Sequence, residues 1–265
     1  MTIKHDKISL DAKHLRKQYD IETNGIADIF SFVNQQGIEL IRYPFGKNTI
    51  LGFSTIFEGK KVIVSNSSEI LSREIYTIAH ELGHIFYDFN ESFSTIKIDK
   101  ESKTNDISEE RAYYFADCLL MPEDKISNIL IETFQKKASE LRAINIVQMQ
   151  LEFRVSYNAL LERMFFLKCI SEAKKKELYQ ERNFYTSKKL FAMLGADEDL
   201  LEPADRLVVS PKYIDYVMSN YNNQYIPFSS LKKALDLVNI DTSDMLERQS
   251  AAEEDSLDDV FGEYL

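Results

Sequence analysis

The stretch IAHELGH, residues 78–84, contains an HExxH pattern in which His80 and His84 flank Glu81 and Leu82-Gly83. Positions i and i+4 of a helix lie on one face, so a helix here places the two imidazoles side by side. Two imidazoles can hold one Zn²⁺, and a glutamate beside them can take a proton from water that the metal activates. The chain has only four histidines, so this spacing is unlike a chance arrangement. We predict that His80 and His84 bind a metal and that Glu81 is the catalytic base.

A catalytic zinc needs a third protein ligand and an open position for water. The extension of the motif found in metzincins would require glycine at position 87 and histidine at position 90, but the chain has Tyr87 and Asn90 there. A carboxylate from a later helix is the remaining option, and residues 108–116, SEERAYYFA, supply two glutamates. Glu109 continues the apolar stripe of that helix at helical spacing and Glu110 does not. We predict Glu109 as the third ligand, with Glu110 as the alternative, and one Zn²⁺ per chain.

Three further residues are candidates for supporting the site. Arg73 precedes the motif by seven residues and can bind loop carbonyls or a carboxylate, or form a surface ion pair. Tyr113 is a possible hydrogen-bond donor to the substrate, and Asp117 could orient a metal-binding histidine. Gly83 permits the close approach of another backbone.

Composition restricts the class of protein. The chain has 265 residues, 44% hydrophobic and 28% charged, and a formal net charge of −11. Such a negative charge disfavours binding over a broad surface of nucleic acid, so we expect no direct DNA binding. Two cysteines do not indicate a disulfide framework. Because no signal-peptide pattern or long apolar run stands out, we expect a cytoplasmic protein that does not contact a membrane.

The residue patterns predict an α+β fold. Residues 8–36 are helical in pattern, and three strand-like segments follow at 38–43, 49–57 and 62–64. We expect a short antiparallel sheet in sequence order, packed on the HExxH helix and on a Glu109-bearing helix that stops at Pro122. The strand that ends near Val64 could then pair with an extended substrate.

We expect three regions along the chain. Residues 1–180 form a zincin-like metallopeptidase domain whose final part, about 123–180, contains a helix-turn-helix-like segment. Residues 181–248 form a small helical C-terminal domain, and the acidic residues 249–265 form a disordered tail.

Two motifs together resemble the ImmA/IrrE family of metallopeptidases, which have a small gluzincin-type core. They are HELGH at residues 80–84 and the run of Glu109, Ala112, Phe115-Ala116 and LLMP at residues 119–122. The resemblance covers about residues 10–170 and implies that His80, His84 and Glu109 bind zinc while Glu81 is the base. The chain differs from the family at Asp117, where a small residue is usual.

The resemblance also implies a partner. Family members typically cleave or inactivate a helix-turn-helix transcriptional repressor of a mobile element or a stress response. We therefore expect a zinc endopeptidase with such a protein substrate. The alternative is a non-catalytic binding or sensor module, of the anti-repressor or toxin–antitoxin type, which inactivates its partner by sequestration.

Overall fold

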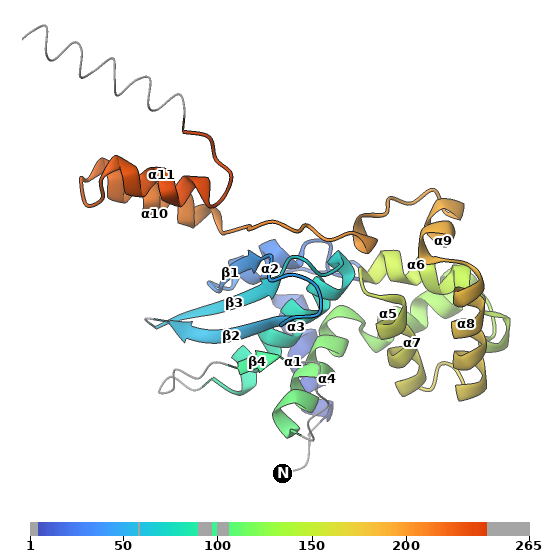
Figure 1. Cartoon of the computed structure of the whole chain (residues 1–265). Coiled ribbons are helices and arrows are strands. Elements are labelled where there is room, and N and C mark those ends of the chain that lie inside the picture. Colours follow the sequence, from blue (N-terminus) through green and yellow to red (C-terminus); the bar gives the residue numbers. More distant parts are fainter. Residues whose placement is uncertain (1–4, 58, 90–96, 100–105, 243–265) are drawn as a thin grey trace, which may run out of the picture. The chain divides into compact units, whose positions relative to one another are not determined.

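The computed structural model describes residues 5–57, 59–89, 97–99 and 106–242, and these divide between Arg206 and Leu207 into two compact units (Figure 1). The predicted acidic tail lies outside the described residues. The α+β fold class is confirmed. The predicted boundaries at residues 180 and 248 stay predictions. No helix of the described ranges is long and apolar enough to cross a membrane.

The first unit begins with a mixed layer of helices and strands. The predicted helical region at residues 8–36 is two helices, because Asp28 accepts hydrogen bonds from the backbone N–H groups of Phe30 and Ser31 and starts a new helix. The elements are α1 (His5–Gln18), α2 (Ile29–Gln35), β1 (Glu39–Tyr43), β2 (Gly52–Phe57), β3 (Lys60–Asn66), α3 (Leu71–Tyr87), β4 (Lys97–Asp99) and α4 (Ile107–Leu120).

The strand order corrects one expectation. The four strands lie in the order β1-β3-β2-β4, and β1 is parallel to β3, so the sheet is neither in sequence order nor wholly antiparallel. The apolar run at residues 62–64 suits a central strand that has neighbours on both sides. Both edges of β3 are therefore occupied, and the prediction that Val64 marks a free edge for substrate is wrong.

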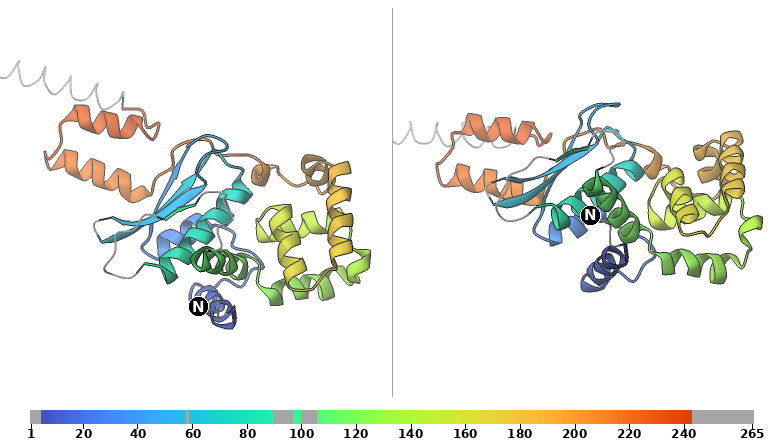
Figure 2. Two further views of the ribbon diagram at one scale, coloured as in Figure 1. Left: turned by 60° about the horizontal axis from the view of Figure 1, so that its bottom comes forward. Right: turned by 90° about the horizontal axis from the view of Figure 1, so that it is seen from below.

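Helix α3 lies between the sheet and α4. It contacts β2 and β3 on one side and α4 on another, and α4 also contacts α1 (Figure 2). The sheet face toward α3 carries Leu40 and Ile63, which belong to the main hydrophobic core. No side chain caps the start of α3; instead the Leu71 N–H donates to the carbonyl of Glu202, 3.1 Å away. The HExxH helix is thus fixed by the sheet, by α4 and by a late segment of the same unit.

A helical region completes the first unit after Pro122. Helices α6 and α7 are joined by residues 154–156, where Arg154 has a positive φ of 56°. The elements are α5 (Glu123–Asn128), a π-helical turn (Ile129–Phe134), a 3₁₀ turn (Ala138–Glu140), α6 (Ala143–Phe153), α7 (Tyr157–Phe166), α8 (Glu172–Phe184), α9 (Ser187–Met193) and a 3₁₀ turn (Asp199–Leu201).

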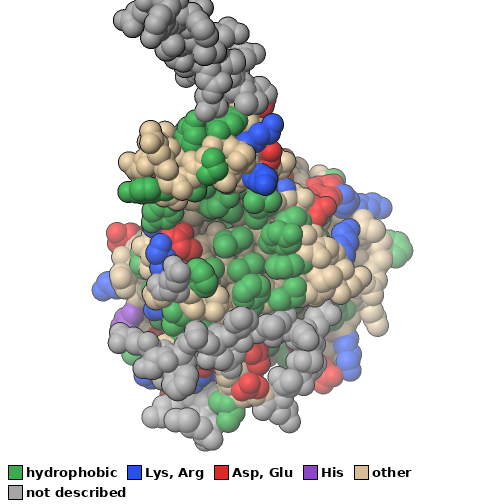
Figure 3. All heavy atoms as spheres, turned by 60° about the vertical axis from the view of Figure 1, so that its left-hand side comes forward, with side chains coloured by type: hydrophobic (Ala, Val, Ile, Leu, Met, Phe, Trp, Pro, Cys, Tyr) green, Lys and Arg blue, Asp and Glu red, His purple; other side chains and the backbone are tan. Residues whose placement is uncertain are grey.

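The second unit contains the helix pair α10 (Pro211–Asn222) and α11 (Phe228–Asp236). The two helices enclose a small hydrophobic cluster built on Val217, Leu231 and Leu235. Figure 3 shows the molecule from the side toward which the β2–β3 hairpin points in Figure 1, and hydrophobic side chains gather near the centre of that view.

Candidate metal centre

The periodicity of α3 divides the HExxH side chains between two neighbours. His80 and His84 face α4, whereas Glu81 faces the sheet and accepts a hydrogen bond of 2.6 Å from the hydroxyl of Ser54 on β2. The three side chains are buried. The single helix therefore presents two imidazoles to one neighbour and a carboxylate to the other.

Three donor atoms meet between α3 and α4. His80 Nε2 and His84 Nε2 lie 3.0 Å apart, and each lies close to a different oxygen of Glu109, at 3.2 and 3.3 Å. These atoms form the one group of His80, His84 and Glu109 among the described residues that can hold a metal ion. A tetrahedral zinc at its usual ligand distances separates its ligand atoms by about 3.3 Å. The spacing of the three donors therefore fits zinc.

The choice between the two glutamates follows from the phase of α4. Glu109 lies in the first turn on the side of Ala112, which is buried against α3, while Glu110 is exposed. A Cβ at Gly83 would lie 3.0 Å from Ala112 Cα and 3.2 Å from its carbonyl oxygen. Glycine at this position thus allows α4 to approach the histidines closely, as its place in the motif indicated.

The residue that orients His84 was missed by the sequence analysis. Asp88 directly follows α3, and its Oδ2 atom lies 2.6 Å from His84 Nδ1. This carboxylate also accepts hydrogen bonds from Ser108 and Arg111 of α4. An ionised Asp88 accepts the Nδ1–H of His84 and leaves Nε2 with its lone pair toward the metal site. The sequence could have predicted this contact, because Asp88 is four residues after His84 and so lies on the same helical face.

The groups around His84 and Asp88 favour a negatively charged Asp88 and a positively charged His84. Burial opposes ionisation of Asp88, but the hydrogen bonds from His84 and Ser108 and the charge of Arg111 lower its pKa to about 2. Burial also opposes protonation of His84, yet the bond to Asp88 and the charges of Glu81 and Glu109 raise its pKa. The cluster attracts a cation strongly, whether that cation is a proton or a metal.

A pocket of about 220 Å³ opens beside His80. Two of the predicted supporting residues line it: Arg73, which pairs with Glu69 at 3.2 Å, and Tyr113, whose ring centroid lies 4.2 Å from that of His80. Leu51 and Thr77 are also in the wall. The volume suits one amino-acid side chain next to the metal centre.

Asp117 is placed away from the histidines. It accepts a hydrogen bond of 2.8 Å from the phenol of Tyr76. Burial, opposed by the charge of Arg163 and by the Tyr76 hydrogen bond, raises the pKa of Asp117 to about 6. The structure thus gives the task expected of Asp117, orienting a metal-binding histidine, to Asp88.

Ser54 is the other contact that the sequence did not indicate. It reaches Glu81 only because β2 pairs with β3, which turns residues 52 and 54 of β2 toward α3. One serine in a strand-like segment carries no signal of such a role. The pairing of distant elements decides it.

The comparison with known families agrees with this geometry. The model of the IrrE N-terminal-like domain matches residues 33–165, which include both metal-site helices and half of the chain. The chain belongs to the ImmA/IrrE family of metallopeptidases. The resemblance noted in the sequence is therefore confirmed, and the family is one of zinc peptidases. No curated protein matches the chain.

Proposed function

We propose that this ImmA/IrrE family member is a zinc-dependent endopeptidase of the cytoplasm. Its substrate is a specific protein, a helix-turn-helix transcriptional repressor, whose cleavage derepresses genes of a mobile element or a stress response. The observation that carries the proposal is the triangle of donor atoms from His80, His84 and Glu109 with the Glu81 carboxylate on the same helix. The negative charge of the chain argues against direct binding to DNA.

The residues around the donors have the properties that peptide hydrolysis requires. Zinc, when held by the three donors, supplies Lewis acidity at an open ligand position. Glu81 accepts the proton of the attacking water and passes it to the leaving nitrogen. Ser54 fixes one oxygen of that carboxylate, and Asp88 holds the His84 ring in the orientation that directs Nε2 to the other donors.

The substrate side chain next to the cleaved bond fits the pocket beside His80. Its volume of about 220 Å³ admits a single side chain, and its wall combines Leu51 and Tyr113 with the charge of Arg73.

Replacing the base separates catalysis from binding. Zinc-loaded wild type and Glu81→Gln are incubated with a peptide library and with purified helix-turn-helix repressors, and mass spectrometry detects new termini. We expect Glu81→Gln to keep zinc and to lose about 10²–10⁴-fold in cleavage rate. Glu110→Gln makes the same change of charge on an exposed side chain and should cleave like the wild type.

Two results would contradict the proposal. Equal cleavage by Glu81→Gln would remove Glu81 from the chemistry. Capture of an uncut repressor by both wild type and Glu81→Gln, with no cleavage of any peptide, would instead support the binding or sensor module.

A further inference from the structure

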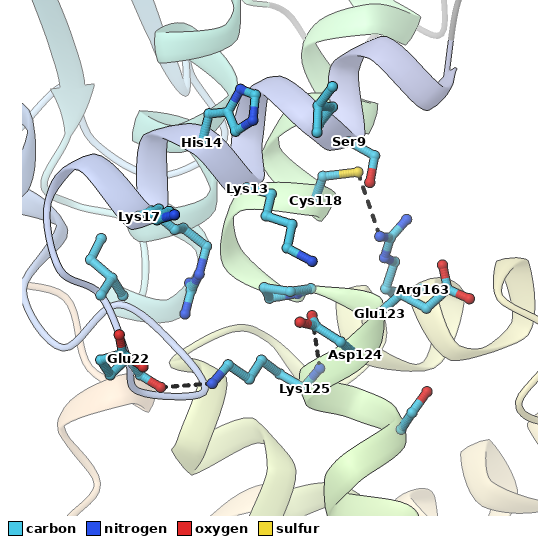
Figure 4. Close-up of a pocket in the computed structure, with 15 residues that line it drawn as sticks. Ser9, Lys13, His14, Lys17, Glu22, Cys118, Glu123, Asp124, Lys125 and Arg163 are labelled. Atoms are coloured by element: carbon cyan, nitrogen blue, oxygen red, sulfur yellow. Dashed lines mark hydrogen bonds between the residues drawn. The ribbon is translucent and has the colours of Figure 1, made fainter.

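A second cavity, of about 820 Å³, lies between α1 and the start of α5 (Figure 4). None of the three metal-site donors lines it. We call it the basic pocket, after its five cationic wall residues Lys13, Arg16, Lys17, Lys125 and Arg163. Its size falls within the range of about 300–1,000 Å³ that is typical of pockets for small molecules.

Two arginines of the basic pocket are buried without an ionic partner. Arg16 is 5% exposed and Arg163 is 2% exposed, and neither has a carboxylate at ion-pair distance in the described part of the chain. Arg16 donates to the carbonyl of Leu119 at 2.9 Å, and Arg163 donates to that of Met121 at 3.3 Å. Buried charges in proteins are normally paired, so two buried guanidinium groups with no carboxylate at ion-pair distance among the described residues are unusual.

The contacts of Arg163 leave part of its donor capacity unused. Nη2 lies 3.5 Å from the sulfur of Cys118, and Nη1 has no hydrogen-bond acceptor among the described residues. Burial lowers the pKa of Arg16 to about 10, with the charge of Asp124 acting in the opposite direction. The wall of the pocket therefore carries buried positive charge, and hydrogen bonds within the protein compensate only part of the energetic cost of removing that charge from water.

Lysines add to this charge at the pocket surface. Figure 4 shows Lys13 extending from α1 toward Asp124 and Lys125, with Lys17 on the same helix. Lys125 donates to the backbone carbonyl of Glu22 at 2.7 Å rather than to a carboxylate. Three carboxylates also line the pocket, so its five cations are in excess although the whole chain has a net charge of −11.

The remaining wall is apolar. Leu10, Ile21 and Pro122 lie among the charged residues. A ligand that satisfies both surfaces has an anionic group for the lysines and an uncharged ring or chain for the apolar wall. The net charge of −11 of the whole chain disfavours a nucleic-acid polymer.

We propose that the basic pocket binds a phosphorylated small molecule of the nucleotide class. Its phosphate contacts Lys13, Lys17 and Lys125, and its organic part packs against Leu10, Ile21 and Pro122. The proposal does not depend on peptidase activity, because the pocket shares no residue with the metal donors.

Isothermal titration of the full chain with AMP, and separately with inorganic phosphate, tests the proposal. We expect saturable binding of AMP that is tighter than that of phosphate and that weakens with added salt. Lys13→Glu should weaken AMP binding by about tenfold or more, since it reverses a charge at the proposed phosphate position. Lys7→Glu is the matched control, because Lys7 is exposed on the same helix and does not line the pocket.

Three results would overturn the proposal. The first is no saturable binding of either compound to the wild type at millimolar concentration. The second is an equal loss of affinity in Lys7→Glu and Lys13→Glu. The third is an affinity for AMP no higher than that for inorganic phosphate, which would show that the organic part of the ligand contributes nothing to binding. Circular dichroism of both variants checks that the fold is retained.

Discussion

Buried charges are treated differently in two regions of the first unit. Around α3, Arg42 forms a two-bond pair with Glu74 at 2.8 and 2.7 Å, and Arg111 binds Asp88. Around the basic pocket, Arg16 and Arg163 are more deeply buried than Arg42 and Arg111 but donate mainly to backbone carbonyls. The first region is electrostatically complete apart from the metal that its donors fit. In the second, neither arginine has a carboxylate at ion-pair distance among the described residues, although three carboxylates line the pocket. This difference separates arginines that are paired within the fold from arginines whose charge adds to a pocket with an excess of cations.

The largest expected effect is on the complete region. Glu74 is 1% exposed and is held by Arg42 and by the Ser65 hydroxyl at 2.8 Å. Arg42→Met leaves this carboxylate buried without its cation, and we expect the free energy of unfolding to fall by about 3–5 kcal/mol. Urea denaturation followed by circular dichroism measures the change. Arg73→Met, which breaks a more exposed pair with Glu69, should cost no more than about 1 kcal/mol; equal losses would refute the distinction.

A second effect concerns pH. The pKa of Asp117 is raised to about 6, so the folded state holds this proton more tightly than the unfolded chain does. The contribution of Asp117 to the free energy of unfolding therefore falls as pH rises from about 4 to about 6, by up to about 3 kcal/mol. Denaturation of metal-free protein at the two pH values should show this fall in the wild type and not in Asp117→Asn. If both proteins respond to pH alike, Asp117 is not the titrating group.

A third effect concerns the metal. Asp88→Asn keeps the size of the side chain but weakens its hold on His84, and we expect zinc affinity to fall by about 10–100-fold. Competition with a chromophoric chelator gives the affinity. Asp117→Asn changes a carboxylate that contacts Tyr76 instead, so its zinc affinity should match the wild type. A loss in Asp117→Asn and none in Asp88→Asn would reverse the assignment of the two aspartates.

The smallest effect is expected in the incomplete region. Arg163→Met removes a buried cation that has no carboxylate at ion-pair distance among the described residues, although its charge acts on Asp117, and it retains most of the side-chain volume. The variant loses the hydrogen bond to the carbonyl of Met121, but folding no longer has to remove a guanidinium charge from water. Because these two effects offset each other, the free energy of unfolding should change by no more than about 1 kcal/mol. Denaturation of the ligand-free chain measures it. A loss as large as that of Arg42→Met would show that Arg163 is stabilised by the fold itself.

The same contrast explains how much could be predicted from sequence. His80, Glu81 and His84 lie on one helix, so their spacing fixes their geometry, and the phase of a second helix selected Glu109 over Glu110. The antiparallel sheet in sequence order was wrong because strand order depends on pairing between distant segments. Ser54 and the residues of the basic pocket come from separate elements that only the fold brings together. Their functions leave no periodic signal in the chain.

The zinc content of three purified proteins tests the central claim most directly. Elemental analysis after purification without chelator compares the wild type with Glu109→Ala and Glu110→Ala. The predicted result is one zinc per chain in the wild type and in Glu110→Ala, and loss of zinc in Glu109→Ala alone. A wild type without zinc, or full zinc content in Glu109→Ala, would contradict the metal centre described here.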